Sequence, residues 1–303
     1  MIIYMSSTNT KQIIIDGSNL LHRCYWVAST IKNVPVALLF TNSIKKLAKE
    51  YIPDDIYVVW DSRTVRGRKN YRQQQVEYKQ TRDKSKNEKV FSHEPACVEI
   101  TKSLGIMHLN PGILEADDYI RWLVYDTNKN SIIVSSDGDL IQLVNEYTSV
   151  LNPITNKHIT NDNFTELTGL QCTEDLIVFK CLVGDKSDNI AGIAGVGPKT
   201  AKKIISEGID KLGSENHTIY TNNRELIDLS VAPMKHPGEY PRLEQNYDSV
   251  VKSRQVDIEL FKTLCTKYNL RTALSSVNEY INVFSGNARD IQDVAARLIK
   301  ALS

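Results

Sequence analysis

The chain of 303 residues contains few cysteines, and no two of them are close in the sequence. An odd total without any C-x-x-C pair indicates neither a zinc site nor a disulfide framework. We therefore expect reduced thiols that serve packing. The cysteines are Cys24, Cys97, Cys172, Cys181 and Cys265.

Long apolar segments are also missing. The longest runs, such as Val36 to Phe40, fall far short of the roughly 20 residues that a membrane-spanning helix needs. The first residues, Met1 to Thr10, lack a basic region followed by an apolar one, so no export signal is indicated. The sequence predicts a cytoplasmic protein without a membrane partner.

The chain as a whole lacks an excess of either charge, with a net charge of +1. The distribution is uneven, however. Between Arg63 and Lys89 there are ten basic and three acidic residues, a net charge of +7, so the remainder carries −6. A basic segment beside an acidic remainder suits a protein that holds both a phosphate backbone and metal cations. The alternative interpretation is a solvated, highly charged helix.

Four short apolar runs indicate buried parallel strands, and their order predicts an α/β fold with right-handed crossovers. The composition, 41% apolar and 24% charged, is ordinary for a globular protein. The runs are Ile13 to Ile15, Ile56 to Trp60, Ile106 to Leu109 and Ile132 to Val134. Further elements are expected as helices at Pro35 to Tyr51, Asp139 to Val144 and Glu174 to Val183, and as an edge strand at Val150 to Leu151.

The character of the sequence changes at Gly184. From there to Ile205 the letters GDKSDNIAGIAGVGPKTAKKII indicate a glycine-rich hairpin between two helices, with Pro198 in the first turn of the second. We predict an α/β core over residues 1–183, including a long, basic polar segment at 63–94. Residues 184–303 then hold the hairpin element (184–205) and C-terminal helices that pack on the core. Those helices are expected at Asn216 to Leu229, Leu243 to Tyr268 and Ile291 to Leu302.

Acidic side chains follow the predicted strands. Asp16 and Asp61 come directly after two of them, and Asp137 and Asp139 lie just beyond a third. The carboxyl ends of parallel strands share one edge, where α/β proteins bind ligands. The fourth strand leads to Glu115, Asp117 and Asp118 at the start of a helix, while Asp185 and Asp188 end another. Taken singly, each acid has an ordinary explanation as a helix cap or turn residue.

Nine acids at one edge would repel one another strongly unless cations were present. Oxygen ligands without His or Cys favour Mg²⁺ or Mn²⁺, and this many carboxylates suggest two or more ions. Two such ions are the arrangement used for in-line displacement at a phosphodiester. The predicted reaction class is hydrolytic phosphoryl transfer.

The ordered motifs of the first 205 residues or so resemble the 5′ nuclease family, which includes bacteriophage 5′ exonucleases, flap endonucleases and the N-terminal domain of bacterial DNA polymerase I. Six segments carry the resemblance: IIIDGSNLLHR from Ile13, VVWDSR from Val58, YKQTRD from Tyr78, LEADDYI from Leu114, SSDGDLIQL from Ser135 and GDKSDNIAGIAGVGPKTA from Gly184. The resemblance implies a PIN-like, Rossmann-like core with helices on both faces of the sheet, a helical arch and a helix-hairpin-helix element.

The resemblance also implies roles for individual residues. Asp16, Asp61, Glu115 and Asp117 would hold a first metal ion, and Asp137, Asp139 and Asp185 a second, with Asp118 and Asp188 as further metal ligands not assigned to either ion. Lys79 and Arg82 would be the arch pair that contacts the scissile phosphate, where a fixed cation stabilises developing charge. Tyr78 would either stack on a base or pack at the base of the arch. The DNA-contacting residues would be Arg63, Arg66, Arg68, Lys69, Arg72, Tyr78, Lys79 and Arg82 in the arch, and Gly195, Gly197, Lys199, Thr200 and Lys202 in the hairpin, which in this family can bind K⁺.

The implied activity is that of a structure-specific 5′ nuclease, a flap endonuclease and 5′→3′ exonuclease of replication or repair. Its partners would be branched or 5′-ended DNA and RNA–DNA primer junctions, and it would act as a monomer in a bacterial or phage-infected cell. No polymerase segment follows, which favours a free-standing, phage-like enzyme. Two alternatives remain at this point: a PIN-like RNase, and a protein that binds branched DNA without cutting it.

Overall fold

The structure is a computed structural model that describes residues 8–61, 71–74, 84–127 and 129–285. Within these ranges lies a six-stranded sheet of order β3-β2-β1-β4-β5-β6. Its strands are β1 (Thr8–Asp16), β2 (Asp55–Val59), β3 (Met107–Leu109), β4 (Lys129–Val134), β5 (Thr148–Leu151) and β6 (His158–Ile159). All pairings are parallel except the last, in which β6 runs antiparallel to β5. The predicted α/β class with a mostly parallel sheet is confirmed.

The central strand β1 explains why helices cover both faces of the sheet. Ile13, Ile14 and Ile15 are all 0% exposed. Successive side chains of a strand point to opposite faces, so Ile13 and Ile15 pack into one apolar cluster and Ile14 into the other. A strand that is apolar on both sides is stable only between two layers.

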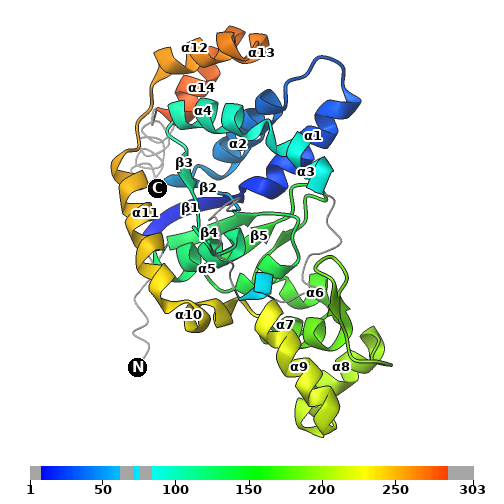
Figure 1. Ribbon diagram of the computed structural model, residues 1–303. Helices are drawn as coiled ribbons and strands as arrows, with labels where there is room; N and C mark the ends of the chain where they lie inside the picture. The colour runs from blue at the N-terminus through cyan, green and yellow to red at the C-terminus, as the bar shows by residue number, and fades with distance from the viewer. Residues whose placement is uncertain (1–7, 62–70, 75–83, 128, 286–303) are drawn as a thin grey trace, which may run out of the picture.

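One face of the sheet is covered by helices from both ends of the chain. Helices α1 (Gly17–Thr30), α2 (Val36–Tyr51) and α4 (Glu94–Ser103) lie on the sheet, and α12 (Ile258–Lys267), α13 (Arg271–Ser275) and α14 (Val277–Phe284) lie over α2 and α4 (Figure 1). Phe40, Ile100, Phe261 and Tyr280 join in the same core cluster. The C-terminal helices therefore pack on the N-terminal part of the fold.

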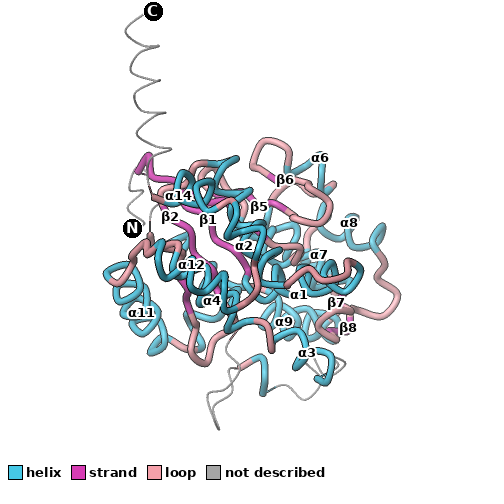
Figure 2. The backbone as a smooth tube through the Cα atoms, turned by 90° about the horizontal axis from the view of Figure 1, so that it is seen from above, coloured by secondary structure: helices cyan, strands magenta, loops and turns pink. Residues whose placement is uncertain are grey.

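The opposite face is covered by α5 (Ala116–Asp126), the 3₁₀ turn η2 (Asp139–Leu143) and α11 (Tyr240–Lys252). Tyr119 of α5 donates a hydrogen bond to the Leu243 carbonyl of α11 at 2.7 Å, which ties the two helices together. Figures 1 and 2 both show α11 at one end of the molecule and α8 (Pro198–Glu207) at the other.

A third apolar cluster lies beyond the end of the sheet. It is formed by α7 (Thr173–Val183), α8 (Pro198–Glu207) and α9 (Ser214–Ile227), with a hairpin of β7 (Gly184–Asp185) and β8 (Ile190–Ala191) between α7 and α8. The predicted helix-hairpin-helix is thus present. Gly184 has a φ of +83°, and a Cβ at this position would stand 2.5 Å from the Ile190 carbonyl oxygen. Only glycine fits there.

The remaining described elements are short. They are η1 (Arg72–Gln74), α3 (Lys84–Phe91), α6 (Phe164–Thr168), η3 (Ile209–Lys211), η4 (Leu229–Val231), α10 (Ala232–Lys235) and η5 (Pro237–Glu239).

Three local predictions were wrong. The strand at Val150 to Leu151 is not an edge, because β6 pairs beyond it. The element at Asp139 is a 3₁₀ turn and not an α-helix. The expected single helix from Leu243 to Tyr268 is two helices, because the Asp257 side chain accepts a hydrogen bond from the Leu260 amide at 2.9 Å and begins a new one.

Candidate functional site

Three neighbouring strands deliver carboxylates to the same edge of the sheet. β1 lies between β2 and β4, with Asp16 in register with Val59 and Ile15 with Val134. Asp16 ends β1, while Asp61 and Asp137 follow β2 and β4 by two and three residues. The topology therefore places all three residues at the same edge of the sheet.

Asp16 is the most enclosed acid of the three, at 7% exposure. Its Oδ1 accepts a hydrogen bond from the Asn19 amide at 2.9 Å, which caps α1, and its Oδ2 accepts one from Ser135 Oγ at 2.9 Å. Burial raises the pKa of Asp16 to about 7, and the charges of Asp61 and Asp137 act in the same direction. A cation at this edge would stabilise the ionised carboxylate.

The second group of acids surrounds a lysine that we did not predict. Lys180, in the last turn of α7, forms ion pairs with Asp139 and with Asp185, the latter at 2.9 Å. Burial raises the pKa of Asp139 to about 6, although Lys180 opposes the rise. Burial acts the same way on Asp185, but hydrogen bonds from Ser187 and the charge of Lys180 outweigh it and lower the pKa of that carboxyl to about 2. A basic residue five positions before Asp185 was the only signal in the sequence.

The third group lies at the start of α5. Asp61 Oδ1 accepts a hydrogen bond from the Ala116 amide at 3.1 Å, so the end of β2 contacts the N-terminus of this helix. Glu115 and Asp118 form a reciprocal capping box around the first turn. Asp117 is half-buried beside them.

Arg72 occupies a different place from the one we expected. We predicted a DNA-contacting arch residue, but its side chain is 1% exposed and reaches the acids of α5. Its guanidinium donates to both carboxylate oxygens of Asp118 at 3.0 Å and to Glu115 at 3.2 Å. Asp118, which we grouped with the metal ligands, is 0% exposed, and its carboxylate is paired with Arg72 inside the protein. Burial raises its pKa, and Arg72 opposes this effect.

Among the described residues, no three His, Cys, Asp or Glu side chains stand in an arrangement that would hold a metal ion. Lys180 and Arg72 supply positive charge to two of the three acidic groups. The donors themselves are carboxylate oxygens, which fit Mg²⁺ or Mn²⁺ better than a soft metal. Asp188, also predicted as a ligand, is buried in the turn between β7 and β8.

The arch residues Arg63, Arg66, Arg68, Lys69, Tyr78, Lys79 and Arg82 lie outside the described part of the chain. The hairpin residues are described. Gly195, with a φ of +77°, Gly197, Lys199 and Thr200 are exposed at the N-terminal end of α8. Lys202 is exposed one turn further on, and its Nζ donates to the Gly169 carbonyl at 2.9 Å. Open backbone amides beside lysines suit an anion such as a phosphate.

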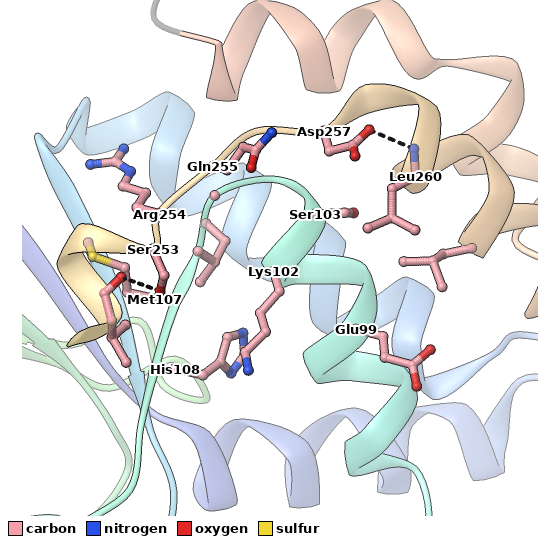
Figure 3. A pocket seen from close by; sticks show the side chains of 14 residues that line it. Glu99, Lys102, Ser103, Met107, His108, Ser253, Arg254, Gln255, Asp257 and Leu260 are labelled. Atoms are coloured by element: carbon pink, nitrogen blue, oxygen red, sulfur yellow. Dashed lines mark hydrogen bonds between the residues drawn. The ribbon is translucent and has the colours of Figure 1, made fainter. Parts of the chain in front are cut away.

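A separate hollow of about 490 Å³ lies between α4, the start of β3 and the segment that joins α11 to α12 (Figure 3). Its lining includes Lys102, Met107, Arg254 and Asp257. Because Met107 begins β3, the hollow is at the opposite end of this strand from the acidic edge. It does not belong to the candidate site.

Comparison with known proteins identifies the family to which the chain belongs. Residues 11–169 match the family model described as the 5′-3′ exonuclease N-terminal, resolvase-like domain. A 5′-3′ exonuclease of Aquifex aeolicus is 32% identical over 260 residues, which cover 82% of this chain and 83% of that protein. No helix in the described residues is long and apolar enough to cross a membrane.

Two solved structures from bacteriophage T5 share the fold. A protein co-crystallised with metal ions superposes with a TM-score of 0.68 at 23% identity, covering 80% of this chain and 99% of that one. A flap endonuclease in a pseudo-enzyme-product complex with DNA and metal ions gives 0.61 at 22%, covering 86% and 99%. The mostly parallel six-stranded sheet flanked by helices resembles PIN-like 5′ nuclease structures. The chain belongs to the 5′-3′ exonuclease family.

Proposed function

We propose that this protein is a structure-specific 5′ nuclease that hydrolyses DNA phosphodiesters, as a flap endonuclease and 5′→3′ exonuclease in replication or repair. The observation that carries the proposal is the gathering of Asp16, Asp61 and Asp137 at one sheet edge, with the hairpin element beside it. The family to which the chain belongs supports the same activity. Substrates would include branched and 5′-ended DNA and RNA–DNA primer junctions, handled by a monomer.

Two or more Mg²⁺ or Mn²⁺ ions would be held by Asp16, Asp61, Glu115 and Asp117 on one side and by Asp137, Asp139 and Asp185 on the other. Such ions would supply the activation of the attacking water and charge stabilisation at the leaving oxygen. The protein's own residues orient the acids: Ser135 and the Asn19 amide fix Asp16, and the Ala116 amide fixes Asp61. Lys180 forms ion pairs with Asp139 and Asp185, and a cation at this place would compete with it for these carboxylates.

DNA would be held at two places. Lys79 and Arg82 would contact the scissile phosphate from the arch, and the exposed hairpin residues Gly195, Gly197 and Lys199 would contact duplex DNA away from the cut. Backbone carbonyls of the hairpin would bind K⁺. The turn geometry supports this second contact, since a glycine at positive φ and a helix N-terminus both let a phosphate approach.

The test is cleavage of 5′-flap, nicked and blunt duplexes with Mg²⁺, Mn²⁺ or a chelator, followed by mapping of the products. We expect cleavage near the flap junction and from 5′ ends, lost with chelator. Asp137→Ala should remove at least a hundredfold of the rate, because it deletes a ligand of the proposed ions, while DNA affinity stays within about threefold. The matched control is Asp162→Ala, an exposed acid near Lys11 and therefore at the other end of the strands.

Wild-type turnover by Asp137→Ala would contradict the proposed site. Cleavage that persists in chelator would contradict metal dependence.

A further inference from the structure

Strands β1 and β4 are joined at the acidic edge by three polar residues, Asn19, Ser135 and Ser136, which we call the serine bracket. Ser135 is 1% exposed and follows the last residue of β4. Its Oγ donates to Asp16 Oδ2 at 2.9 Å and accepts from the Asp137 amide at 3.0 Å. One hydroxyl group thus connects the carboxylate of β1 to the backbone that carries the carboxylate of β4.

The other half of the bracket holds the loop after β4 from the side of α1. The Ser136 amide donates to Asn19 Oδ1 at 3.1 Å, and Asn19 Nδ2 donates to Ser136 Oγ at 2.8 Å. The amide of Asn19 itself donates to Asp16 Oδ1 at 2.9 Å. Both oxygens of Asp16 and both ends of the Ser135–Asp137 turn are therefore fixed by this set of bonds.

The arrangement has an electrostatic cost that the bracket offsets. Ser135 Oγ contacts both the Asp16 carboxylate and the Asp137 amide, so the two acidic residues are neighbours at this edge. Two carboxylates that repel would turn apart if their backbones and side chains were free, and a cation would then have to draw them together. Hydrogen bonds that hold the Asp16 carboxylate and the backbone of Asp137 reduce that requirement before any cation arrives.

We propose that Asn19, Ser135 and Ser136 are positioning residues that set the separation between the carboxylates of β1 and β4 and so tune the affinity of the site for divalent cations. This inference rests on the proposed metal-dependent function and deepens it. Residues that orient ligands in this way typically contribute a factor of about 10 to 100 in metal affinity. None of the three needs to touch DNA to have this effect.

The experiment is a titration of the full-length protein with Mn²⁺ alone, with free Mn²⁺ followed by its electron paramagnetic resonance signal. Ser135→Ala should bind the ion about 10- to 100-fold more weakly than the wild type. In cleavage assays the Mn²⁺ concentration for half-maximal rate should rise by a similar factor, whereas the rate at saturating Mn²⁺ should change much less.

The chain offers a closely matched control in Ser131. This serine is on the same strand and 2% exposed, and its Oγ also connects β4 to β1, through Gln12 Nε2 at 2.9 Å. It lies four residues before Ser135, or about 13 Å along the strand, away from the carboxylates. Ser131→Ala should lower the thermal midpoint as much as Ser135→Ala does and leave Mn²⁺ affinity unchanged.

Two further variants distinguish a loss of metal affinity from a loss of folding. Asn19→Ala removes the side-chain bonds to Ser136 but retains the backbone amide that caps α1, so it should weaken Mn²⁺ binding without unfolding the helix. Ser135→Thr retains the hydroxyl and should restore affinity to within about threefold of the wild type.

Wild-type affinity in Ser135→Ala and Asn19→Ala would overturn the role of the bracket. Equal weakening by Ser131→Ala would overturn it too, because strand pairing in general would then be the cause. A wild-type protein that neither binds Mn²⁺ nor cleaves DNA would instead overturn the proposed function, and the bracket with it.

Discussion

His108 on β3 is a buried polar residue whose protonation state is set by its neighbours. The Trp60 indole donates to Nδ1 at 2.8 Å, so this nitrogen carries no proton. The proton is then on Nε2, which lies 2.8 Å from Thr101 Oγ1, while that hydroxyl donates to the Cys97 carbonyl at 2.6 Å. Burial lowers the pKa of His108 to about 3. The neutral ring therefore belongs to the core beneath Asp61.

Because His108 is buried in its neutral form, we predict that the free energy of unfolding depends on pH. Its pKa is about 6.5 in the unfolded chain and about 3 in the folded one, so the unfolded state binds more protons between these values. The contribution of neutral His108 to the free energy of unfolding is fully present above pH 6.5. Below pH 6.5 this contribution falls by about 1.4 kcal/mol per pH unit. In urea unfolding, the stability difference between wild type and His108→Asn should shrink at this rate from pH 6.5 to 5. A constant difference would contradict the assignment.

At the same scale, the positions of the acids could be predicted and their partners could not. A residue that follows a parallel strand is placed by the topology of the sheet, which the apolar runs already indicate, so the strand-end positions of Asp16, Asp61 and Asp137 follow from the sequence. Arg72 and Lys180 lie 46 and 41 positions away from Asp118 and Asp139. Such contacts depend on how distant segments dock, and no local pattern encodes them.

At the scale of elements, the short turn η1 is the clearest departure from the sequence prediction. Residues 63–94 were expected to form one continuous arch, but η1 is fixed against the core within this stretch. Arg72 donates to the Leu226 carbonyl at 3.0 Å, and the Tyr71 amide donates to His236 Nε2 at 3.1 Å. The turn thus joins the acids of α5 to the helices near the C-terminal end of α9. Helix α1 was also missed, because it begins directly at the strand end without a separating loop.

The ion pairs of η1 should contribute strongly to stability. Arg72→Ala would leave Asp118, at 0% exposure, without its charge partner, and we expect a loss of about 3 to 5 kcal/mol in the free energy of unfolding. Urea denaturation measures it. The control is Lys235→Ala, which removes an exposed ion pair with Glu225 and should cost at most about 1 kcal/mol. Equally small losses in the free energy of unfolding of both variants would show that the Arg72 ion pairs do not contribute strongly to stability.

At the scale of the whole molecule, charge is divided between two regions. Residues 63–89 carry +7 and the rest of the chain −6. In the proposed function, the acids at the sheet edge would bind cations and the basic segment would bind phosphates, although the total charge of the protein is nearly zero. Long-range attraction to DNA then depends on the basic segment and the hairpin lysines and not on net charge.

Affinity for a 5′-flap substrate should therefore fall steeply with salt. A protein that makes six to ten phosphate contacts loses about 10³ to 10⁵ in affinity between 50 and 200 mM salt. Binding measured by fluorescence anisotropy, with Ca²⁺ in place of Mg²⁺, would give the slope. Lys199→Ala should make it shallower by about one unit. A flat salt dependence would exclude these residues as a phosphate track.

The antiparallel strand β6 covers the edge of β5 by pairing with its backbone. Val150 and Leu151 of β5 pair with Ile159 and His158, and the Asn152 amide closes the connecting turn by donating to the Lys157 carbonyl at 2.8 Å. Without this cover, β5 would present unpaired backbone groups to solvent, ready to accept a strand from another molecule. Two residues of reversed strand thus guard against the edge-to-edge aggregation to which parallel sheets are prone while they fold.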